Sequence, residues 1–247
     1  MLSKMGRINR QNVGYGIPSD APLYAKPPFY YTDLERLVFQ YETDEEAVLD
    51  ILPEGLEVLT PATATLQFVR YPFSTLGPYL EAILSVGCLW EGSPRSFVAH
   101  IVVDTDPPQA AGREIWGFPK KFAHITFDME GDLIIGTMER PRGNRICTGV
   151  MRPERSIELG DGTPVPGVSL RVIPNPDDNM EPSLMELIEG RPGNGKTRDA
   201  WTGPGFAEYN STSTLDPWHR FTIKKLVRAS YSRGDMVLNH GKVIKTY

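Results

Sequence analysis

The runs "ATLQFVRYPF" (residues 64–73), "EAILSVGCLW" (81–90) and "SFVAHIVVDT" (96–105) follow one another closely and decide the fold. Each is short, rich in β-branched and aromatic residues, and bounded by Gly or Pro, which is typical of a β-strand. No helical segment separates them, so an antiparallel meander is favoured over parallel βαβ units. Similar runs occupy residues 122–129, 133–139, 169–174, 221–232 and 235–247. The sequence therefore predicts a β-rich α+β fold, with an antiparallel, barrel-like sheet and few helices.

One segment has a clear helical signature. In "TDEEAVLDILP" (43–53), Thr43 and Glu46 have the spacing of a capping box, an apolar stripe follows, and Pro53 ends the pattern. The run "EPSLMELIEG" (181–190) is compatible with either a strand or a helix, because short apolar runs do not fix the period. Residues 1–29 lack periodicity and are expected to form an extended arm of a single domain spanning 1–247.

Composition excludes several functional classes. The 247 residues carry a net charge of −5, with a pI of about 5.5 and no long Lys/Arg run, so a nucleic-acid partner is not expected. No apolar stretch approaches the ~18 residues of a membrane span, and the N-terminus lacks the apolar run of a secretory signal. Cys88 and Cys147 stand far apart outside any metal-binding pattern. A cytoplasmic location is expected, without a membrane partner.

Two apparent motifs are interpreted as structural. "GRPGNGKT" (190–197) matches the spacing of a phosphate-binding loop, which requires a following helix. Pro192 removes one backbone amide, and the segment "GPG" (203–205) prevents that helix from continuing, so a surface hairpin loop is predicted. No metal site is predicted, because ligand spacing is missing from the four histidines, His100, His124, His219 and His240.

The segment "GREIWGFPKKF" (112–122) places Lys120 and Lys121 among aromatic residues. Successive side chains of a strand point to opposite faces, so one of the two amines is expected to enter the interior. A desolvated ammonium beside another cation is disfavoured relative to the free amine. A free amine is a nucleophile that condenses with a ketone to form an imine.

This segment resembles the lysine motif of the acetoacetate decarboxylase superfamily, and "VIPNPD" (172–177) and "AWTGP" (200–204) extend the resemblance along the chain. That superfamily is itself the known example of a lysine activated by a neighbouring cation. The resemblance implies that Lys120 is the imine-forming nucleophile and Lys121 the cation that favours its uncharged form. It also implies that Glu81, in "LGPYLEA", acts as an acid or base.

Candidate substrate-binding residues surround these groups. Trp116, Phe118 and Tyr79 are candidates for the pocket walls, and Phe118 stands where decarboxylases more often have tyrosine. Arg113 and Glu114 belong to the motif of the superfamily. For this pair, a structural salt bridge or turn anchor is at least as compatible with the sequence as substrate binding.

Two departures from the family pattern bear on the reaction. By the resemblance, Leu34 and Leu66 stand where decarboxylases carry an arginine and a glutamate, while Arg36 lies two positions from the first. Loss of both charges favours aldol condensation–dehydration of pyruvate with an aldehyde, or hydration of a 2-oxo-enoate. Decarboxylation of acetoacetate and a catalytically silent scaffold are the alternatives. A small oxo acid, joined by an aldehyde in the condensation branch, is the expected partner of a homo-oligomer without metal or organic cofactor.

Overall fold

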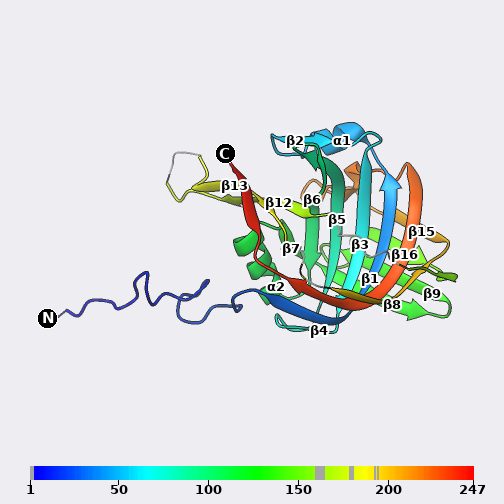
Figure 1. Cartoon of the computed structure of the whole chain (residues 1–247). Helices are drawn as coiled ribbons and strands as arrows, with labels where there is room; N and C mark the ends of the chain where they lie inside the picture. The colour runs from blue at the N-terminus through cyan, green and yellow to red at the C-terminus, as the bar shows by residue number, and fades with distance from the viewer. Residues whose placement is uncertain (1–2, 159–164, 178–180, 192, 194) are drawn as a thin grey trace.

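The computed structural model describes residues 3–158, 165–177, 181–191, 193 and 195–247. Its strands form two sheets (Figure 1). Within the described residues, the larger sheet comprises β1 (Phe29–Glu42), β2 (Leu56–Val58), β3 (Thr63–Tyr71), β4 (Phe73–Ser74), β5 (Tyr79–Trp90), β6 (Ser93–Val103), β7 (Lys120–Phe122), β11 (Arg155–Ser156), β12 (Gly167–Ile173), β13 (Leu184–Glu189), β14 (Lys196–Thr202), β16 (Lys225–Leu238) and β17 (Lys242–Thr246).

The smaller sheet has the strand order β15-β10-β9-β8. Its strands are β8 (His124–Glu130), β9 (Leu133–Glu139), β10 (Arg145–Met151) and β15 (Gly205–Tyr209). The helical segments described are short, namely α1 (Glu45–Leu49), α2 (Asp106–Ala111), the π-helix η1 (Gly112–Trp116) and the 3₁₀-helix η2 (Trp218–Arg220). The predicted β-rich α+β fold with few helices is confirmed.

The larger sheet is mixed rather than purely antiparallel. Its main path runs β11-β14-β16-β1-β3-β5-β6-β12-β13-β17, and β2, β4 and β7 attach to β5, β1 and β6. The central strands β1, β3, β5 and β6 pair antiparallel, as the opening runs of the sequence predict. Parallel pairing occurs where β6 meets β7 and β12. The strand β7, which carries the two lysines, is therefore added to the sheet after a helical crossover.

A large hydrophobic cluster fills the space between the two sheets. Phe39 of β1 and Phe68 of β3 are fully buried in it. Each of these rings packs against a glycine of the smaller sheet. A Cβ at Gly136 would lie 2.3 Å from the ring of Phe68, and a Cβ at Gly149 would lie 2.3 Å from the ring of Phe39. Only glycine permits this approach. Because one core joins both sheets, the arrangement supports our proposal of a single domain.

A second hydrophobic cluster occupies the opposite face of the larger sheet. Side chains alternate between faces along a strand. On β1, Phe39 enters the first cluster and Leu34 the second, and on β3, Phe68 enters the first and Tyr71 the second. Trp116 of η1 packs in the second cluster. This cluster surrounds the buried lysine described below.

Local details differ from the sequence predictions. The N-cap of α1 is Asp44, whose carboxylate accepts a hydrogen bond from the backbone N–H of Glu46 at 3.1 Å, so the capping role predicted for Thr43 is wrong. The run 181–190 contains strand β13. The run predicted over 221–232 and the first part of the run predicted over 235–247 are joined in the single long strand β16, and the remainder of the second run contains β17. The paired neighbour β1 is equally long, which keeps β16 continuous through Gly234.

The segments outside the sheets agree with a structural interpretation of the remaining motifs. Residues 3–28 contain no strand or helix and extend from the sheets as an arm (Figure 1). In the "GRPGNGKT" segment, Lys196 and Thr197 begin strand β14 instead of a helix, while Pro192 and Asn194 lie outside the described residues. Of the helices in the described ranges, none has the length and apolar character needed to cross a membrane.

Candidate active site

Lys120 reaches the interior through a sharp turn after η1. Gly117 ends the helix in a left-handed conformation with φ of 71°, and a Cβ there would lie 2.3 Å from the Cα of Arg171. Glycine alone meets both demands. The chain then enters β7, where Lys120 pairs in parallel with Ile101 of β6. As a result, Lys120 is 5% exposed.

The helix also leaves room for the lysine stem. A Cβ at Gly112 would lie 2.7 Å from Cδ and 2.8 Å from Cε of Lys120, closer than non-bonded carbon atoms approach. Arg113 holds the same strand by donating from Nη1 to the backbone oxygen of Lys120 at 3.2 Å. The first two residues of the motif therefore position the amine without contributing chemistry to it.

The partner of the buried amine is Glu81 of β5. Nζ of Lys120 lies 2.8 Å from Oε2 of Glu81, and Glu81 is 4% exposed. Two charges removed from water in this way require each other, since loss of one partner strands the other at a cost of several kcal/mol. An amine can act as a nucleophile when it is uncharged, and a carboxylate can accept and return protons, so this arrangement is suited to such chemistry.

Three tyrosines, Tyr31, Tyr71 and Tyr79, pack together beside this pair, and we refer to them as the tyrosine cluster. The ring centroids of Tyr71 and Tyr79 lie 4.4 Å apart, and those of Tyr31 and Tyr71 lie 4.9 Å apart. The hydroxyl of Tyr71 donates to Oε1 of Glu81 at 3.3 Å, and Nζ of Lys120 lies 5.7 Å from the ring centroid of Tyr79.

Burial raises the pKa of Tyr71 and of Tyr79 well above the ordinary value, and the negative charge of Glu81 adds to both shifts. Burial is also the main cause of the raised pKa of Tyr31. The phenolic groups of the tyrosine cluster are therefore neutral at physiological pH and act as hydrogen-bond donors.

Lys121 points away from this site. Its Nζ donates to Oδ1 of Asp216 at 3.0 Å and to the backbone oxygen of Leu215. Arg140 also contacts the Asp216 carboxylate, from Nε at 3.0 Å. The prediction that one lysine of the pair turns inward is confirmed, whereas the expected placement of the Lys121 ammonium beside Lys120 is wrong. Neighbouring side chains of β7 project to opposite faces, and Asp216 holds the outer one.

The remaining motif residues have identifiable structural contacts. Trp116 is buried and stacks on Phe118, with ring centroids 5.7 Å apart and an interplanar angle of 15°. Phe118 faces the amine, since Nζ of Lys120 lies 5.8 Å from its ring centroid. Glu114 accepts a hydrogen bond from the Tyr24 hydroxyl of the arm. Glu114 thus anchors the arm, and of these three residues Phe118 is the one that faces the Lys120 amine.

The two leucines in question lie on different faces of the larger sheet. Leu34 is buried in the cluster that contains Tyr71 and Tyr79. Leu66 is fully buried between the sheets beside Phe68. The expectation that Leu66 contributes to substrate binding is therefore wrong, because its position on β3 directs it to the opposite face from Tyr71.

Sequence reasoning missed Tyr31 and Tyr71 as residues of the site. Tyr71 pairs directly with Tyr79 across the hairpin of β3 and β5, and this register brings Tyr71 to Glu81. The signal in the sequence was the alternation of side chains along each strand, which places Tyr79 and Glu81 on one face of β5 and allows Tyr71 of β3 to share that face. It becomes informative only once the register of the hairpin is known.

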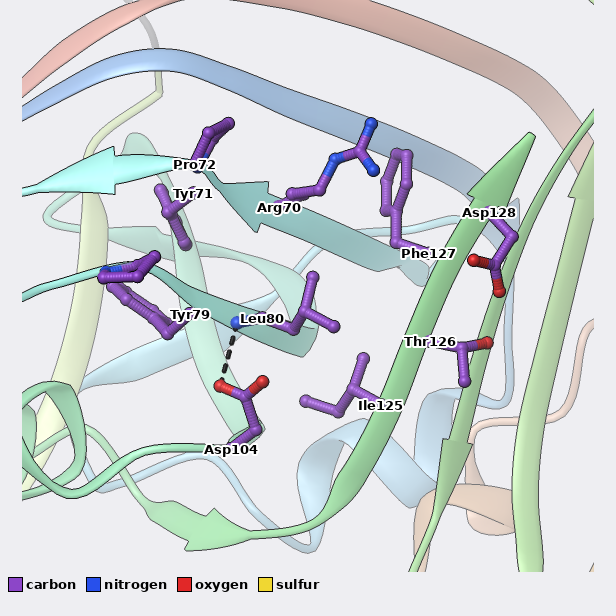
Figure 2. A pocket seen from close by; sticks show the side chains of 11 residues that line it. Arg70, Tyr71, Pro72, Tyr79, Leu80, Asp104, Ile125, Thr126, Phe127 and Asp128 are labelled. Atoms are coloured by element: carbon purple, nitrogen blue, oxygen red, sulfur yellow. Dashed lines mark hydrogen bonds between the residues drawn. The ribbon is translucent and has the colours of Figure 1, made fainter.

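A surface pocket of about 480 Å³ opens where β3 and β5 approach β8 (Figure 2). Tyr71, Tyr79 and Asp104 line it, and Oδ1 of Asp104 accepts a hydrogen bond from the backbone N–H of Leu80 at 2.9 Å (Figure 2). Lys120 and Glu81 do not line this pocket, whereas Tyr71 and Tyr79 belong both to its lining and to the tyrosine cluster. Within the described ranges, no group of three or more His, Cys, Asp or Glu residues is arranged to hold a metal ion.

Comparison with known proteins supplies independent information. The family model described as acetoacetate decarboxylase (ADC) matches residues 18–247. An acetoacetate decarboxylase from Acidiphilium cryptum (strain JF-5) is 32% identical over 245 residues, which cover 96% of this chain and 97% of the relative.

Solved structures show the same similarity in three dimensions. The acetoacetate decarboxylase from Legionella pneumophila subsp. pneumophila str. Philadelphia 1 has a TM-score of 0.87 and 30% identity, covering 100% of this chain and 99% of the other. The enduracididine biosynthesis enzyme MppR, complexed with pyruvate, has a TM-score of 0.80 and 20% identity, covering 96% and 99% of the two chains. The second match supports the fold only.

Proposed function

The chain belongs to the acetoacetate decarboxylase family, and on that premise we propose that it decarboxylates a small β-keto acid through an imine on Lys120. The observation that carries the proposal is the buried pair of Lys120 and Glu81, with 2.8 Å between Nζ and Oε2. An isolated ion pair buried for stability alone gains little over apolar residues of similar volume. A buried amine beside a proton acceptor is instead well suited to attack a carbonyl carbon.

The proposed reaction begins with transfer of a proton from Lys120 to Glu81. The free amine attacks the ketone carbon, and loss of water from the resulting carbinolamine gives a protonated imine. The bond between the α-carbon and the carboxylate then breaks, CO₂ leaves, and the electron pair moves toward the imine nitrogen. Glu81 gives the proton that it took from Lys120 to the departing water, and it then receives another proton from solvent. The product enamine takes this second proton at carbon from Glu81, and hydrolysis of the imine releases the ketone and Lys120.

The tyrosine cluster supports these steps by holding Glu81. The neutral Tyr71 hydroxyl donates to Oε1 while Oε2 faces Lys120, so the carboxylate is fixed with one oxygen directed at the amine. Fixed donors in a water-poor site stabilise developing charge without reorganising during the reaction. The protein itself supplies the electron sink in this scheme, through the imine nitrogen.

Condensation–dehydration of pyruvate with an aldehyde, or hydration of a 2-oxo-enoate, is the second candidate. Leu34 favours it, since an apolar residue lies in the cluster where decarboxylases carry a charge. The argument from Leu66 is lost, because Leu66 lies between the sheets. The condensation branch is not confirmed, and relatives named acetoacetate decarboxylase that cover nearly the whole chain favour decarboxylation. A silent scaffold is disfavoured by the intact Lys120–Glu81 pair.

Borohydride reduction tests the proposal. The protein is incubated with acetoacetate or pyruvate, reduced, and examined by peptide mass analysis, while CO₂ release and aldehyde-dependent absorbance are followed in parallel. We expect an adduct on Lys120 and rapid CO₂ release from acetoacetate. Lys120→Arg should lose the adduct, and the matched variant Lys121→Arg should keep it. An adduct that survives Lys120→Arg, or no adduct in the unsubstituted protein, would refute the imine.

The partners expected from the sequence are carried into this proposal. A small oxo acid is the substrate, and an aldehyde is required only in the condensation branch. The homo-oligomer implied by the resemblance is part of the proposal, and its state is measurable by light scattering during size-exclusion chromatography.

A further inference from the structure

Arg36 of β1 carries a half-buried guanidinium group that the protein leaves largely unengaged. Its Nη2 lies 3.0 Å from Sδ of Met236, which is the only hydrogen bond of this side chain within the described part of the chain. No carboxylate in that part lies within ion-pairing distance of it. A thioether is a weak acceptor, whereas a guanidinium offers five donors. Most of the hydrogen-bonding capacity of Arg36 is therefore available to a ligand.

The strand register places Arg36 on the same face as the reactive pair. Arg36 pairs with Val69 of β3, and Val69 pairs with Glu81 of β5. Residues paired across antiparallel strands project to the same face of a sheet. Arg36 and Glu81 consequently lie in one row, separated by a single apolar side chain.

The guanidinium contacts β16 at a residue that neighbours the tyrosine cluster. Met236, which it contacts, pairs through its backbone with Tyr31. The charge of Arg36 also reaches Tyr71, since it opposes the burial that raises the pKa of that phenol. Tyr71 in turn donates to Glu81. The contact with Met236 and the strand register therefore relate Arg36 to the cluster that holds Glu81.

The charges in this row do not balance. Arg36 and the amine of Lys120 are two cations, and Glu81, which contacts Lys120, provides one anion. Glu35, the neighbour of Arg36 in sequence, is engaged by Arg70 at 2.7 Å and belongs to the other face of the strand. A partly buried site with one surplus positive charge is stabilised by an anion, because water screens the charge only in part.

We propose that Arg36 binds the carboxylate of the oxo-acid substrate while Lys120 bonds to its ketone carbon. This inference rests on the proposed function and identifies the substrate-recognition residue of the same site. A guanidinium binds a carboxylate through two parallel N–H···O bonds, which fix orientation as well as position. Loss of such a contact affects substrate binding more than the bond-breaking step, so KM should respond more strongly than kcat.

The test compares an anionic with a neutral ketone. Acetoacetate and acetone both present a carbonyl carbon to Lys120, but acetone has no carboxylate. We expect Arg36→Met, which keeps an unbranched stem beside Met236, to raise the half-saturating concentration of acetoacetate about 10- to 100-fold. Borohydride trapping of acetone on Lys120 should remain unchanged. Arg36→Lys should recover part of the acetoacetate binding.

Arg228→Met is the matched control. Arg228 of β16 pairs with Gln40, which lies four residues after Arg36 on β1. Arg228 therefore projects from the same face of the sheet as Arg36, at a greater distance from the tyrosine cluster. Equal weakening by Arg228→Met would attribute the effect to general charge and overturn the inference. So would unchanged acetoacetate binding in Arg36→Met, or a parallel loss of acetone trapping in that variant. Failure of the unsubstituted protein to trap either ketone would instead refute the imine mechanism itself.

Discussion

Substitution of Gly112 by alanine should separate the activity of this protein from its stability. Gly112 begins η1 with φ of −61° and ψ of −45°, a helical conformation that alanine adopts readily. The new Cβ would nevertheless lie 2.7 Å from Cδ, 2.8 Å from Cε and 3.4 Å from Nζ of Lys120. The atoms that it meets belong to a flexible side chain, so the lysine yields and the backbone keeps its path.

The magnitude follows from these distances. Ordinary carbon–carbon contacts are about 3.5–4.0 Å, so the stem of Lys120 must move by about 1 Å. A misplacement of that size can cost about 100-fold in rate, or about 2.7 kcal/mol of transition-state stabilisation. Replacement of glycine by alanine inside a helix stabilises the folded protein by up to about 1 kcal/mol. The variant should therefore fold at least nearly as stably while it reacts far more slowly.

The assay measures kcat for CO₂ release from acetoacetate, borohydride trapping on Lys120, and the thermal midpoint of the same preparations. Gly167→Ala is the control, because a Cβ at Gly167 has Ser96 O at 3.9 Å as its nearest neighbour. We expect a thermal midpoint within about 4 °C of the unsubstituted protein for both variants. If Gly112→Ala reacted at the original rate, the reasoning that catalysis requires a residue without a Cβ beside the Lys120 stem would be refuted.

Two further changes follow from the same structure. Tyr71→Phe removes the 3.3 Å hydrogen bond to Glu81 and should lower kcat about 3- to 10-fold, as judged by initial rates. Tyr79→Phe, whose hydroxyl contacts Tyr31 at 3.5 Å, should have less effect, and equal rates for both variants would contradict this ordering. Burial lowers the pKa of His100 to about 4, whereas unfolded histidine titrates near 6.5, so the unfolded state binds the proton first as pH falls. His100 thus contributes a loss of stability of about 2 kcal/mol between pH 7 and pH 5, which His100→Phe should remove in urea titrations; an unchanged pH dependence would refute the assignment.

Local patterns were sufficient to predict most strands of this fold. Alternating apolar residues and Gly/Pro boundaries located β3, β5, β6 and β9, because each strand buries its face in a regular period. The division of the strands between two sheets was not predictable in this way. It depends on contacts between distant segments, such as Gly136 against Phe68, that no local pattern encodes.

The candidate site shows the same division between local and distant information. The family resemblance identified Lys120 and Glu81, which the structure brings to 2.8 Å from one another. It could not reveal Tyr71, whose place beside Glu81 follows from the hairpin register, nor that Leu66 faces the other cluster. A one-residue shift in register would have exchanged the two faces of β3, and neither alternative is distinguishable in an isolated strand.

Adjacency in the motif is equally misleading for the lysine pair. Lys121 is the residue nearest to Lys120 in sequence, yet its charge is paired with Asp216, which Arg140 also contacts. An ammonium already paired in this way, on the opposite face of β7, has little repulsion left to exert on the inner amine. The reactivity proposed for Lys120 must then come from its burial and from Glu81, and the second cation that matters to the substrate is Arg36 on β1. Replacement of Lys121 by an uncharged residue should consequently disturb the packing of β7 more than it disturbs imine formation.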